Sequence, residues 1–447
     1  MTADRPRAVG GRDPRHPSTD LESNVTAQAS DRLGVGIVGS GFIADFHTRA
    51  FRGVRDADVT AVCGRTESSV RGVCDLAREL RVGDPTPYAD IREMVRDPAV
   101  DAVWITTPNH VRLETVRAVA EEVSSGRASL RGIAVEKPLG RTVAEAEEVM
   151  RLVQDAGLLH GYLENQVFAP GVTRAHDLVW SRGAGAAGSP YLARCAEEHS
   201  GPHKAWFWQG EKQGGGVLND MMCHSVEAGR FLLTPPGVPS SEWLTPVSVD
   251  ATIACLKWSR PAYADELMRR YGPEVDYRGR PSEDYARATI VFRNGDGDEV
   301  VAEGTTSWSY VGAGLRLSFE LLGPEYAMQV NSLDTEAKVF LSREIAGKQG
   351  EDLVEKQNAE GGLMPILPDE AGAYGYTEED RHMVTRFLEG RSPDEGLDDG
   401  LQVTRLLMAA YLSAQEGRRI DLTDAAQTAK LSGFVPEVAQ GTWRPGH

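Results

Sequence analysis

Asp220 and His224 form a pair of residues that could transfer a proton. They follow the glycine run Gly214–Gly216 and lie four positions apart, so a helix would place both on one face. A carboxylate beside an imidazole can orient the ring and raise its basicity, which a proton-accepting histidine needs. The pattern therefore predicts that His224 is a general base oriented by Asp220. The alternative is a core histidine satisfied by a neighbouring side chain.

A second pattern, near the start of the chain, is typical of dinucleotide binding. The segment from Gly39 to Ala44 matches G-x-G-x-x-G/A, in which the first glycine allows a tight turn and the second lets a pyrophosphate approach the backbone. The apolar run Leu33–Val38 precedes it and helical spacing follows, so the N–H groups of a helix N-terminus would face the phosphates. The alternative is a glycine turn that binds nothing. We predict a cofactor site that includes Gly39, Ser40, Gly41, Phe42 and Ile43.

The residues after the second expected strand, Val59–Cys63, bear on which dinucleotide binds. An NAD-specific site usually has an acidic residue there for the ribose 2′-hydroxyl. This chain has Arg65 and Thr66, which could pair with a 2′-phosphate or hydrogen-bond to it. The sequence therefore predicts an NAD(P)(H) site and slightly favours NADP(H). The alternative is that Arg65 is a solvated surface arginine and the protein uses NAD(H).

Two further loops follow expected strands, after Ala102–Thr106 and after Gly132–Val135. Because the carboxyl ends of the strands line the ligand crevice in a doubly wound sheet, both loops should meet the cofactor. A lysine in the second loop could also donate a hydrogen bond to a substrate hydroxyl. The alternatives are a proline that merely ends a strand and a surface Glu–Lys pair. The predicted contacts are Thr107, Pro108, Asn109, His110, Glu136 and Lys137.

Candidate substrate contacts lie in Glu197–Trp208, where polar side chains alternate with indoles. Sugars and polyols favour such a surface, because hydroxyls need hydrogen bonds and C–H faces stack on aromatic rings. The alternative is that the tryptophans anchor this loop in the core. A zinc site built on His199 and His203 is disfavoured, because Gly201-Pro202 keeps them off one helix, and no metal is predicted. The predicted substrate contacts in this segment are His199, Trp206 and Trp208, and Glu164 and Asn219 outside it are predicted as well.

The expected order of strands and helices changes near residue 160. Before it, strands alternate with helices, which predicts a doubly wound parallel sheet over 32–160. A capping box formed by Thr142 and Glu145 opens one of its helices, Thr142–Ala156. We expect the other helices at Val70–Leu80, Ile91–Arg96 and His110–Val123.

Beyond residue 160, strand-like runs follow one another through short turns such as Asn294–Gly297. This predicts an α+β domain over 161–425 with an open, mainly antiparallel sheet, closed by helices at Thr377–Leu388 and Leu401–Ala414. We expect a surface loop at Gly361–Tyr376 and a C-terminal tail over 426–447. The expected strands are Tyr191–Cys195, Val247–Trp258, Arg287–Arg293, Glu299–Ser307, Leu315–Leu322 and Lys338–Leu341.

Composition limits the class of protein. The chain has 447 residues, of which 41% are hydrophobic and 26% charged, as in a globular protein with a sizeable core. A net charge of −18 argues against a nucleic-acid partner, which needs a basic surface. The five cysteines are scattered, and no apolar run is long enough to span a bilayer. Residues 1–31 should form a disordered tail without a secretory signal, so we expect a cytoplasmic protein with no membrane partner.

Taken in order, these motifs resemble the Gfo/Idh/MocA oxidoreductase family, which includes glucose–fructose oxidoreductase and inositol dehydrogenase. The match spans roughly residues 33–420 and includes the Gly39–Ala44 turn, the Thr107 and Glu136 loops and the Gly214–His224 block. The resemblance implies a Rossmann domain followed by a sheet that forms the substrate pocket and, often, a homo-oligomer interface. It also implies Lys137, Asp220 and His224 as the catalytic group.

Together these features predict an NAD(P)-dependent oxidoreductase that oxidises or reduces a secondary alcohol of a sugar, glycoside or cyclitol. One alternative is an NAD-dependent glycoside hydrolase that acts by transient sugar oxidation and elimination, with Glu164, Glu197 or Glu198 as an extra acid or base. A further alternative is a non-catalytic cofactor-binding sensor. Lys137 is the next candidate for the base if His224 is not.

Overall fold

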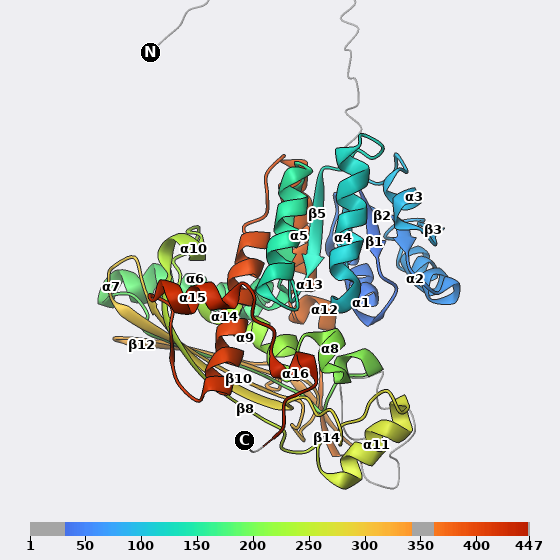
Figure 1. Cartoon of the computed structure of the whole chain (residues 1–447). Coiled ribbons are helices and arrows are strands. Elements are labelled where there is room, and N and C mark those ends of the chain that lie inside the picture. The colour runs from blue at the N-terminus through green and yellow to red at the C-terminus, as the bar shows by residue number, and fades with distance from the viewer. Residues whose placement is uncertain (1–31, 342–361, 446–447) are drawn as a thin grey trace, which may run out of the picture. The chain divides into compact units, whose positions relative to one another are not determined.

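The protein is described here from a computed structural model, which covers residues 32–341 and 362–445. The tail predicted over residues 1–31 lies outside this range. Within the described range, six parallel strands form a sheet in the order β3-β2-β1-β4-β5-β6, with helices on its faces (Figure 1). Its elements are β1 (Leu33–Val38), α1 (Phe42–Ala50), η1 (Phe51–Gly53), β2 (Ala57–Cys63), α2 (Glu67–Leu80), β3 (Thr86–Tyr88), α3 (Ile91–Val95), β4 (Ala102–Ile105), α4 (Asn109–Ser124), β5 (Gly132–Glu136), α5 (Val143–Asp155) and β6 (Leu159–Leu163). The predicted Rossmann fold is confirmed.

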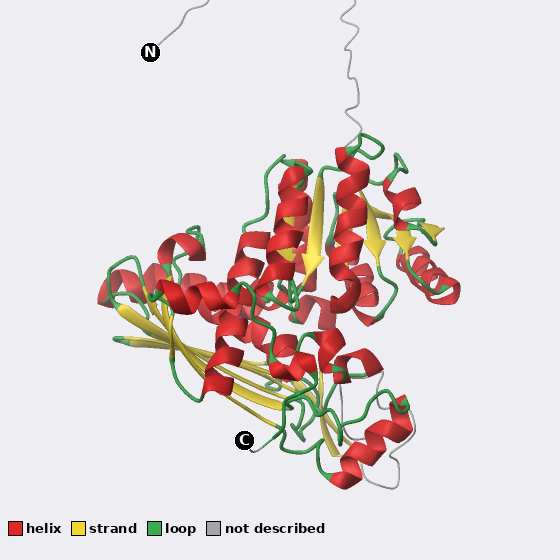
Figure 2. Cartoon of the chain, viewed as in Figure 1, coloured by secondary structure: helices red, strands yellow, loops and turns green. Residues whose placement is uncertain are grey.

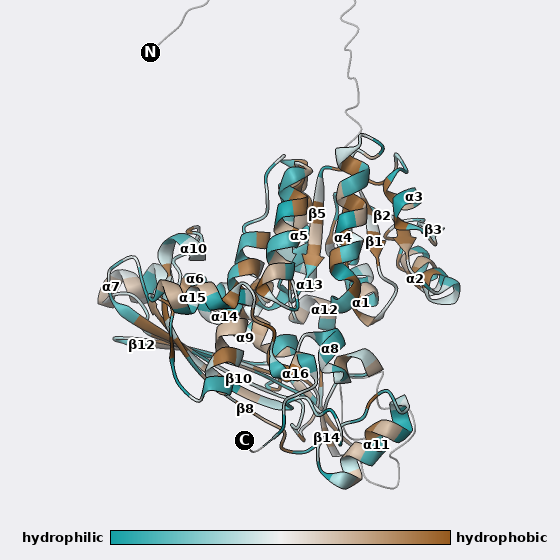
Figure 3. Cartoon of the chain, viewed as in Figure 1, coloured by the Kyte–Doolittle hydropathy of each residue, from teal (hydrophilic) through white to brown (hydrophobic). Residues whose placement is uncertain are grey.

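The central strands of this sheet are apolar because both of their faces are covered. Every residue of β1, β4 and β5 is buried, and Figure 3 shows β1, β2 and β5 in brown beside helices with hydrophilic stretches. Thr142 caps α5 as predicted, by accepting a hydrogen bond from the backbone N–H of Glu145. The Glu145 carboxylate, however, accepts from the N–H of Arg141, one residue before the position that a capping box requires.

The second half of the chain forms a seven-stranded mixed sheet in the order β12-β11-β7-β10-β9-β8-β15, again within the described residues (Figure 2). Only β7 and β10 pair in parallel, so the prediction of a mainly antiparallel sheet is confirmed. Helices α9 (Val217–Leu232) and α14 (Leu397–Glu416) pack against it. The strands are β7 (Leu192–Glu198), β8 (Thr245–Ala254), β9 (Tyr285–Arg293), β10 (Glu299–Ser307), β11 (Arg316–Gly323), β12 (Tyr326–Asn331) and β15 (Ile420–Asp421).

The remaining elements surround these two sheets. They are η2 (Asn165–Phe168), α6 (Pro170–Leu178), η3 (Val179–Ala184), α7 (Gly185–Ala187), η4 (Ala205–Trp208), α8 (Gly210–Gln213), α10 (Ser240–Trp243), α11 (Pro261–Tyr271), β13 (Ala337–Leu341), β14 (Gly362–Ile366), α12 (Glu370–Ala373), α13 (Tyr376–Leu388), α15 (Ala425–Leu431) and α16 (Glu437–Gln440). No helix among the described residues is both long enough and apolar enough to cross a membrane.

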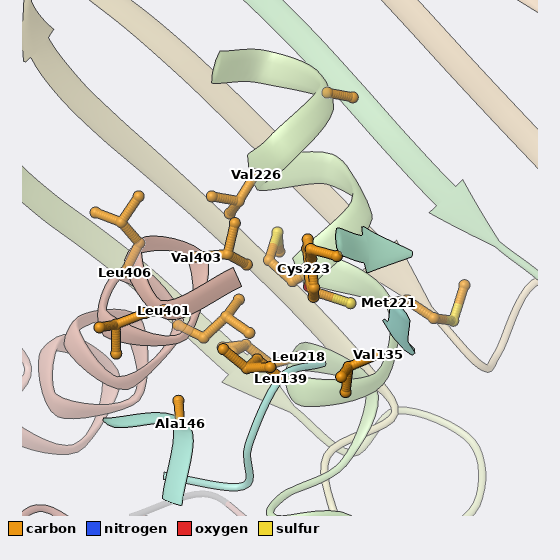
Figure 4. Close-up of a cluster of buried hydrophobic side chains, with 14 of the residues drawn as sticks. Val135, Leu139, Ala146, Leu218, Met221, Cys223, Val226, Leu401, Val403 and Leu406 are labelled. Atoms are coloured by element: carbon orange, nitrogen blue, oxygen red, sulfur yellow. The ribbon is translucent and has the colours of Figure 1, made fainter. Parts of the chain in front are cut away.

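One hydrophobic cluster joins the two halves. Helix α14 packs against α5 as well as against α9 and β8. Figure 4 shows buried side chains of this cluster from β5, α5, α9 and α14, among them Val135, Ala146, Met221 and Leu406. Because this cluster is continuous, it fixes the position of the carboxyl end of β5 relative to the first turns of α9.

Two predictions about the second half are wrong. In its described part, the expected surface loop at Gly361–Tyr376 contains β14 and α12. The described part of the expected tail over 426–447 contains α16 and most of α15, and it buries Trp443. These segments are too short to show a periodic pattern. The boundary predicted at residue 160 falls inside β6, which pairs with β5.

Helix α13 belongs in space to the first domain, although it follows the second sheet in sequence. Its Met383, Val384 and Phe387 lie in the same buried cluster as β1 and Trp104. The Phe387 ring stands edge-on to Trp104 at 5.9 Å between centroids. The two predicted domains therefore interleave along the chain.

Replacing Phe387 should test this assignment. Phe387→Ala should lower the free energy of unfolding by about 3–5 kcal/mol, because it leaves a cavity under the parallel sheet. Urea unfolding measures the change, and Phe340→Ala is a matched control because that ring is 68% exposed. A loss below about 1 kcal/mol for Phe387→Ala would contradict a role for α13 in this core.

Candidate active site

A cavity of about 1140 Å³ lies between the carboxyl ends of the parallel strands and the second sheet. Its walls come from the glycine turn after β1, from the loops after β2, β4 and β5, and from α9 and the segment Pro202–Gln209. All of the residues predicted to bind the cofactor line it, namely Gly39, Ser40, Gly41, Phe42, Ile43, Arg65, Thr66, Thr107, Pro108, Asn109, His110, Glu136 and Lys137.

The glycine turn has the geometry that a dinucleotide needs. Gly39 has a φ of +119°, and a Cβ there would lie 2.5 Å from Thr106 Oγ1, so only glycine fits. Gly41 caps α1, and a Cβ there would meet nothing within 4 Å. The N-terminus of α1 therefore opens into free space where a pyrophosphate could approach the backbone.

Arg112 connects the loops that follow β4 and β5. Its buried guanidinium donates hydrogen bonds to the carbonyl oxygens of Pro138 and Thr107. The Asn109 side chain donates to Gln213 at 3.0 Å (carbonyl oxygen) and 2.9 Å (Oε1), which joins the first loop to α8. Arg112 is not among the predicted site residues, because a buried arginine in a helix gives no local signal.

Lys137 pairs with Asp220 at the wall of the cavity. Its ammonium donates a 2.9 Å hydrogen bond to the Asp220 carbonyl oxygen and lies 3.6 Å from Oδ1 of the same residue. Trp308 Nε1 donates to Asp220 Oδ2 at 3.2 Å. Burial alone would lower the pKa of Lys137, but the Asp220 carboxylate and others nearby raise it above its ordinary value. Lys137 is therefore an ammonium, which disfavours it as the base.

His224 is held by Glu164. The ring Nδ1 and Glu164 Oε1 share a 2.5 Å hydrogen bond, and both side chains are buried. The hydrogen bonds of Asp220 go to Lys137 and Trp308, so the prediction that Asp220 orients His224 is wrong. Helical spacing put both residues on one face, but Glu164 reaches the ring from the carboxyl end of β6.

The other ring nitrogen faces the cavity. His224 Nε2 lies 3.7 Å from Glu197 Oε2, which also accepts a 2.8 Å hydrogen bond from Gln166 Nε2. Burial raises the pKa of Glu164 to about 8, and burial together with the Lys137 ammonium lowers the pKa of His224 to about 4. His224 is therefore neutral near pH 7 and can accept a proton at Nε2 when Nδ1 carries the hydrogen.

The predicted substrate contacts fall into two groups. Trp206 lines the cavity, with its ring 6.0 Å from that of His110. Glu164 lies behind His224, and three others lie behind the cavity wall: Trp208 packs against Trp258 and Trp308, His199 Nδ1 accepts from the N–H of Gly201, and Asn219 donates to the Gln213 carbonyl oxygen. The positions of Glu164, His199, Trp208 and Asn219 do not support their prediction as substrate contacts.

Several cavity residues were not predicted. His203 and Lys204 lie in the segment Glu197–Trp208, which was expected to contact substrate, but they were not chosen from it. The others come from separate segments and belong to no motif: Gln166, Glu274, Leu315, Leu317 and Tyr376. A carboxylate directly after the last parallel strand was the one available signal for Glu164, since strand ends line the crevice.

Three buried groups in the described residues could supply three metal ligands each. In the group nearest the cavity, His224 Nδ1 already bonds to Glu164 and the Cys223 thiol donates to the Asp220 carbonyl oxygen. Burial raises the pKa of that thiol well above its ordinary value. These partners favour a hydrogen-bonded pair over a metal centre, and His199 and His203 belong to none of the three groups.

Comparison with known proteins gives two family matches. Residues 33–162 match the family described as "Oxidoreductase family, NAD-binding Rossmann fold", and residues 181–328 match "GFO/IDH/MocA C-terminal domain". Levoglucosan dehydrogenase of Pseudarthrobacter phenanthrenivorans is 26% identical over 409 residues, which cover 87% of this chain and 98% of that enzyme.

Solved structures share the whole fold. GenD2 from gentamicin A biosynthesis, in complex with NAD, aligns with a TM-score of 0.68 at 24% identity over 92% of this chain and 99% of that one. Levoglucosan dehydrogenase, in complex with NADH and levoglucosan, aligns with a TM-score of 0.64 at 21% identity over 88% of this chain and 100% of that one. The two family matches cover more than half of the chain, which therefore belongs to the GFO/IDH/MocA family of oxidoreductases with an NAD-binding Rossmann fold.

Proposed function

We propose that this protein is an NAD(P)-dependent dehydrogenase that oxidises a secondary alcohol of a sugar, glycoside or cyclitol. One observation carries the proposal: His224, supported by Glu164, and the Lys137 ammonium reach the same cavity that the glycine turn opens at its other end. The names of the relatives, which include sugar and inositol dehydrogenases, support the substrate class.

The residues divide the chemistry between them. A bound nicotinamide would supply the hydride acceptor. His224 Nε2 takes the hydroxyl proton, while Nδ1–H donates to the Glu164 carboxylate, which keeps the ring in the tautomer that a base needs. Lys137, held by Asp220, donates to the substrate oxygen and stabilises the negative charge that develops there. Trp206 offers a ring on which a sugar face could stack.

His224→Asn should test the base directly. We expect kcat to fall by about 10²–10⁴, the usual contribution of a positioned general base. Dinucleotide binding should be retained, because the predicted phosphate contacts lie at Gly39–Ala44. Steady-state kinetics across a panel of polyols and glycosides, followed by reduced-nicotinamide absorbance with NAD⁺ and NADP⁺, measures the effect. Full activity of this variant would contradict the assignment.

The Glu164 pair should appear in the pH profile. Since burial raises the pKa of Glu164 to about 8, the ionised form that favours Nδ1–H on His224 increases as the pH rises through that value. We expect kcat/KM for oxidation to rise over this range in the native protein. The Glu164→Gln variant should have a lower kcat/KM, and this kcat/KM should not rise with pH over the same range. If the rise persists in the variant, the titrating group is not Glu164.

Arg65 should decide cofactor choice. It lies exposed at the cavity rim after β2. If it pairs with a 2′-phosphate, Arg65→Ala should weaken NADP(H) binding by about 1.5–3 kcal/mol and leave NAD(H) binding unchanged. Fluorescence titration with both reduced cofactors measures this. Equal losses for the two cofactors, or no loss, would remove the basis for preferring NADP(H).

An NAD-dependent glycoside hydrolase is the second candidate, and one observation favours it. Glu197 lines the cavity within 3.7 Å of His224 Nε2, where it could act as an extra acid or base. Release of an aglycone without net reduction of the cofactor would identify this activity, whereas net NAD(P)H formation identifies the dehydrogenase.

Two further expectations stay predictions. One is a cytoplasmic location. The other is a homo-oligomer, either a dimer or a tetramer, formed through the second sheet.

A further inference from the structure

A buried network of ionisable groups lies directly behind the cavity. His47 of α1 is fully buried, with Nδ1 2.8 Å from Asp380 Oδ1 of α13 and Nε2 3.2 Å from Glu136 Oε1 at the end of β5. Trp104 Nε1 donates to the same Asp380 oxygen at 2.8 Å. The network thus joins one residue of the cavity wall, Glu136, to a helix that the chain adds some 240 residues later.

The geometry sets the charge of His47. Each ring nitrogen faces a carboxylate oxygen, and an ionised carboxylate only accepts hydrogen bonds. Both nitrogens must then donate, which requires the imidazolium form. The electrostatics agree: burial alone would lower the pKa of His47, but Asp380 and Glu136 raise it well above its ordinary value.

Glu136 is the one member of the network that reaches the cavity. Its Oε2 accepts a 3.0 Å hydrogen bond from the backbone N–H of Lys137, while Oε1 faces His47. Two oxygens with about four acceptor positions leave sites for a ligand in the cavity. His47 itself does not line the cavity, so any effect that it has on a bound molecule must pass through Glu136.

We propose that His47 is a positioning residue for the cofactor site: its buried imidazolium, held by Asp380, keeps the Glu136 carboxylate ionised and aimed into the cavity. The inference rests on the proposed contact between Glu136 and the cofactor. It assigns α13 a functional role, since this helix supplies the anion that holds His47 in its charged form.

The other charged neighbours favour the same state. Lys137 and Arg112 face Glu136 and, with His47, lower its pKa against the effect of burial. Glu379 and Asp380 face His47 from α13, and burial raises the pKa of Glu379 well above its ordinary value. Neither Glu379 oxygen has a hydrogen-bond partner among the described residues, so no hydrogen bond offsets the effect of burial on its pKa.

The test is a double-mutant cycle on cofactor affinity, measured without substrate by the fluorescence of reduced nicotinamide. His47→Gln should raise the cofactor Kd by roughly tenfold. Glu136→Gln should raise it by at least as much. The double variant should resemble Glu136→Gln, because His47 acts through that carboxylate. In His47→Gln the Kd should also rise as pH falls from about 8 to 6, as Glu136 takes up a proton, whereas the native Kd stays constant.

His176→Gln is the matched control. His176 is also buried and hydrogen-bonded, to the Thr234 carbonyl oxygen at 2.8 Å, but it lies outside the cavity. This variant should leave the Kd unchanged. If His47→Gln fails to fold, Asp380→Asn keeps the side-chain shape, removes the anion that holds His47 and enters the same cycle with Glu136→Gln.

Two results would overturn the inference and differ in what else they affect. If Glu136→Gln weakens binding but His47→Gln does not, or if the two effects multiply, His47 does not act through Glu136 and the proposed function stands. If Glu136→Gln leaves the Kd unchanged, Glu136 does not contact the cofactor, and that part of the proposed site is wrong together with the inference.

Discussion

An ionisable side chain that is buried away from water is stable in its charged form only beside a partner, and this requirement shapes the centre of the molecule. The 2.5 Å hydrogen bond between His224 and Glu164 meets it for the residue best placed to accept a proton. Beside this pair, Lys137 and Asp220 are partners for each other. One layer deeper, His47 is paired with Glu136 and Asp380. Each partnership joins segments distant in sequence, so the site exists only when the whole chain has folded.

Packing holds these partners at hydrogen-bonding distance. The cluster shared by β5, α5, α9 and α14 sets Lys137, at the end of β5, against the first turns of α9. Helix α13 closes the opposite face of the parallel sheet and brings Asp380 under the cavity. Close-packed interiors resist small displacements, so the reacting groups are pre-organised by the apolar core around them.

The two halves of the chain supply different parts of the cavity wall. The first half of the chain contributes backbone-rich turns suited to phosphates and ribose, whereas the second half contributes α9, Glu197 and the aromatic segment near Trp206. This arrangement lets one surface recognise a cofactor while the other is free to vary for a substrate. Glu164 and Gln166 lie where the two halves meet, just after β6. Glu164 bonds to the His224 ring, and Gln166 donates to Glu197.

Features that depend on neighbours along the chain could be predicted from the amino-acid sequence. The glycine turn at Gly39, the loops that follow β4 and β5, and the helix that carries His224 each have a local pattern, because backbone conformation and strand ends are local properties. The hydrogen-bond and ion-pair partners depend on the fold: Glu164 for His224, Lys137 for Asp220 and Asp380 for His47. It also placed Trp208 and Asn219 behind the cavity wall and α13 in the first domain. A buried polar group bonds to whatever the fold brings within about 3 Å, and no spacing rule in one sequence encodes that distance.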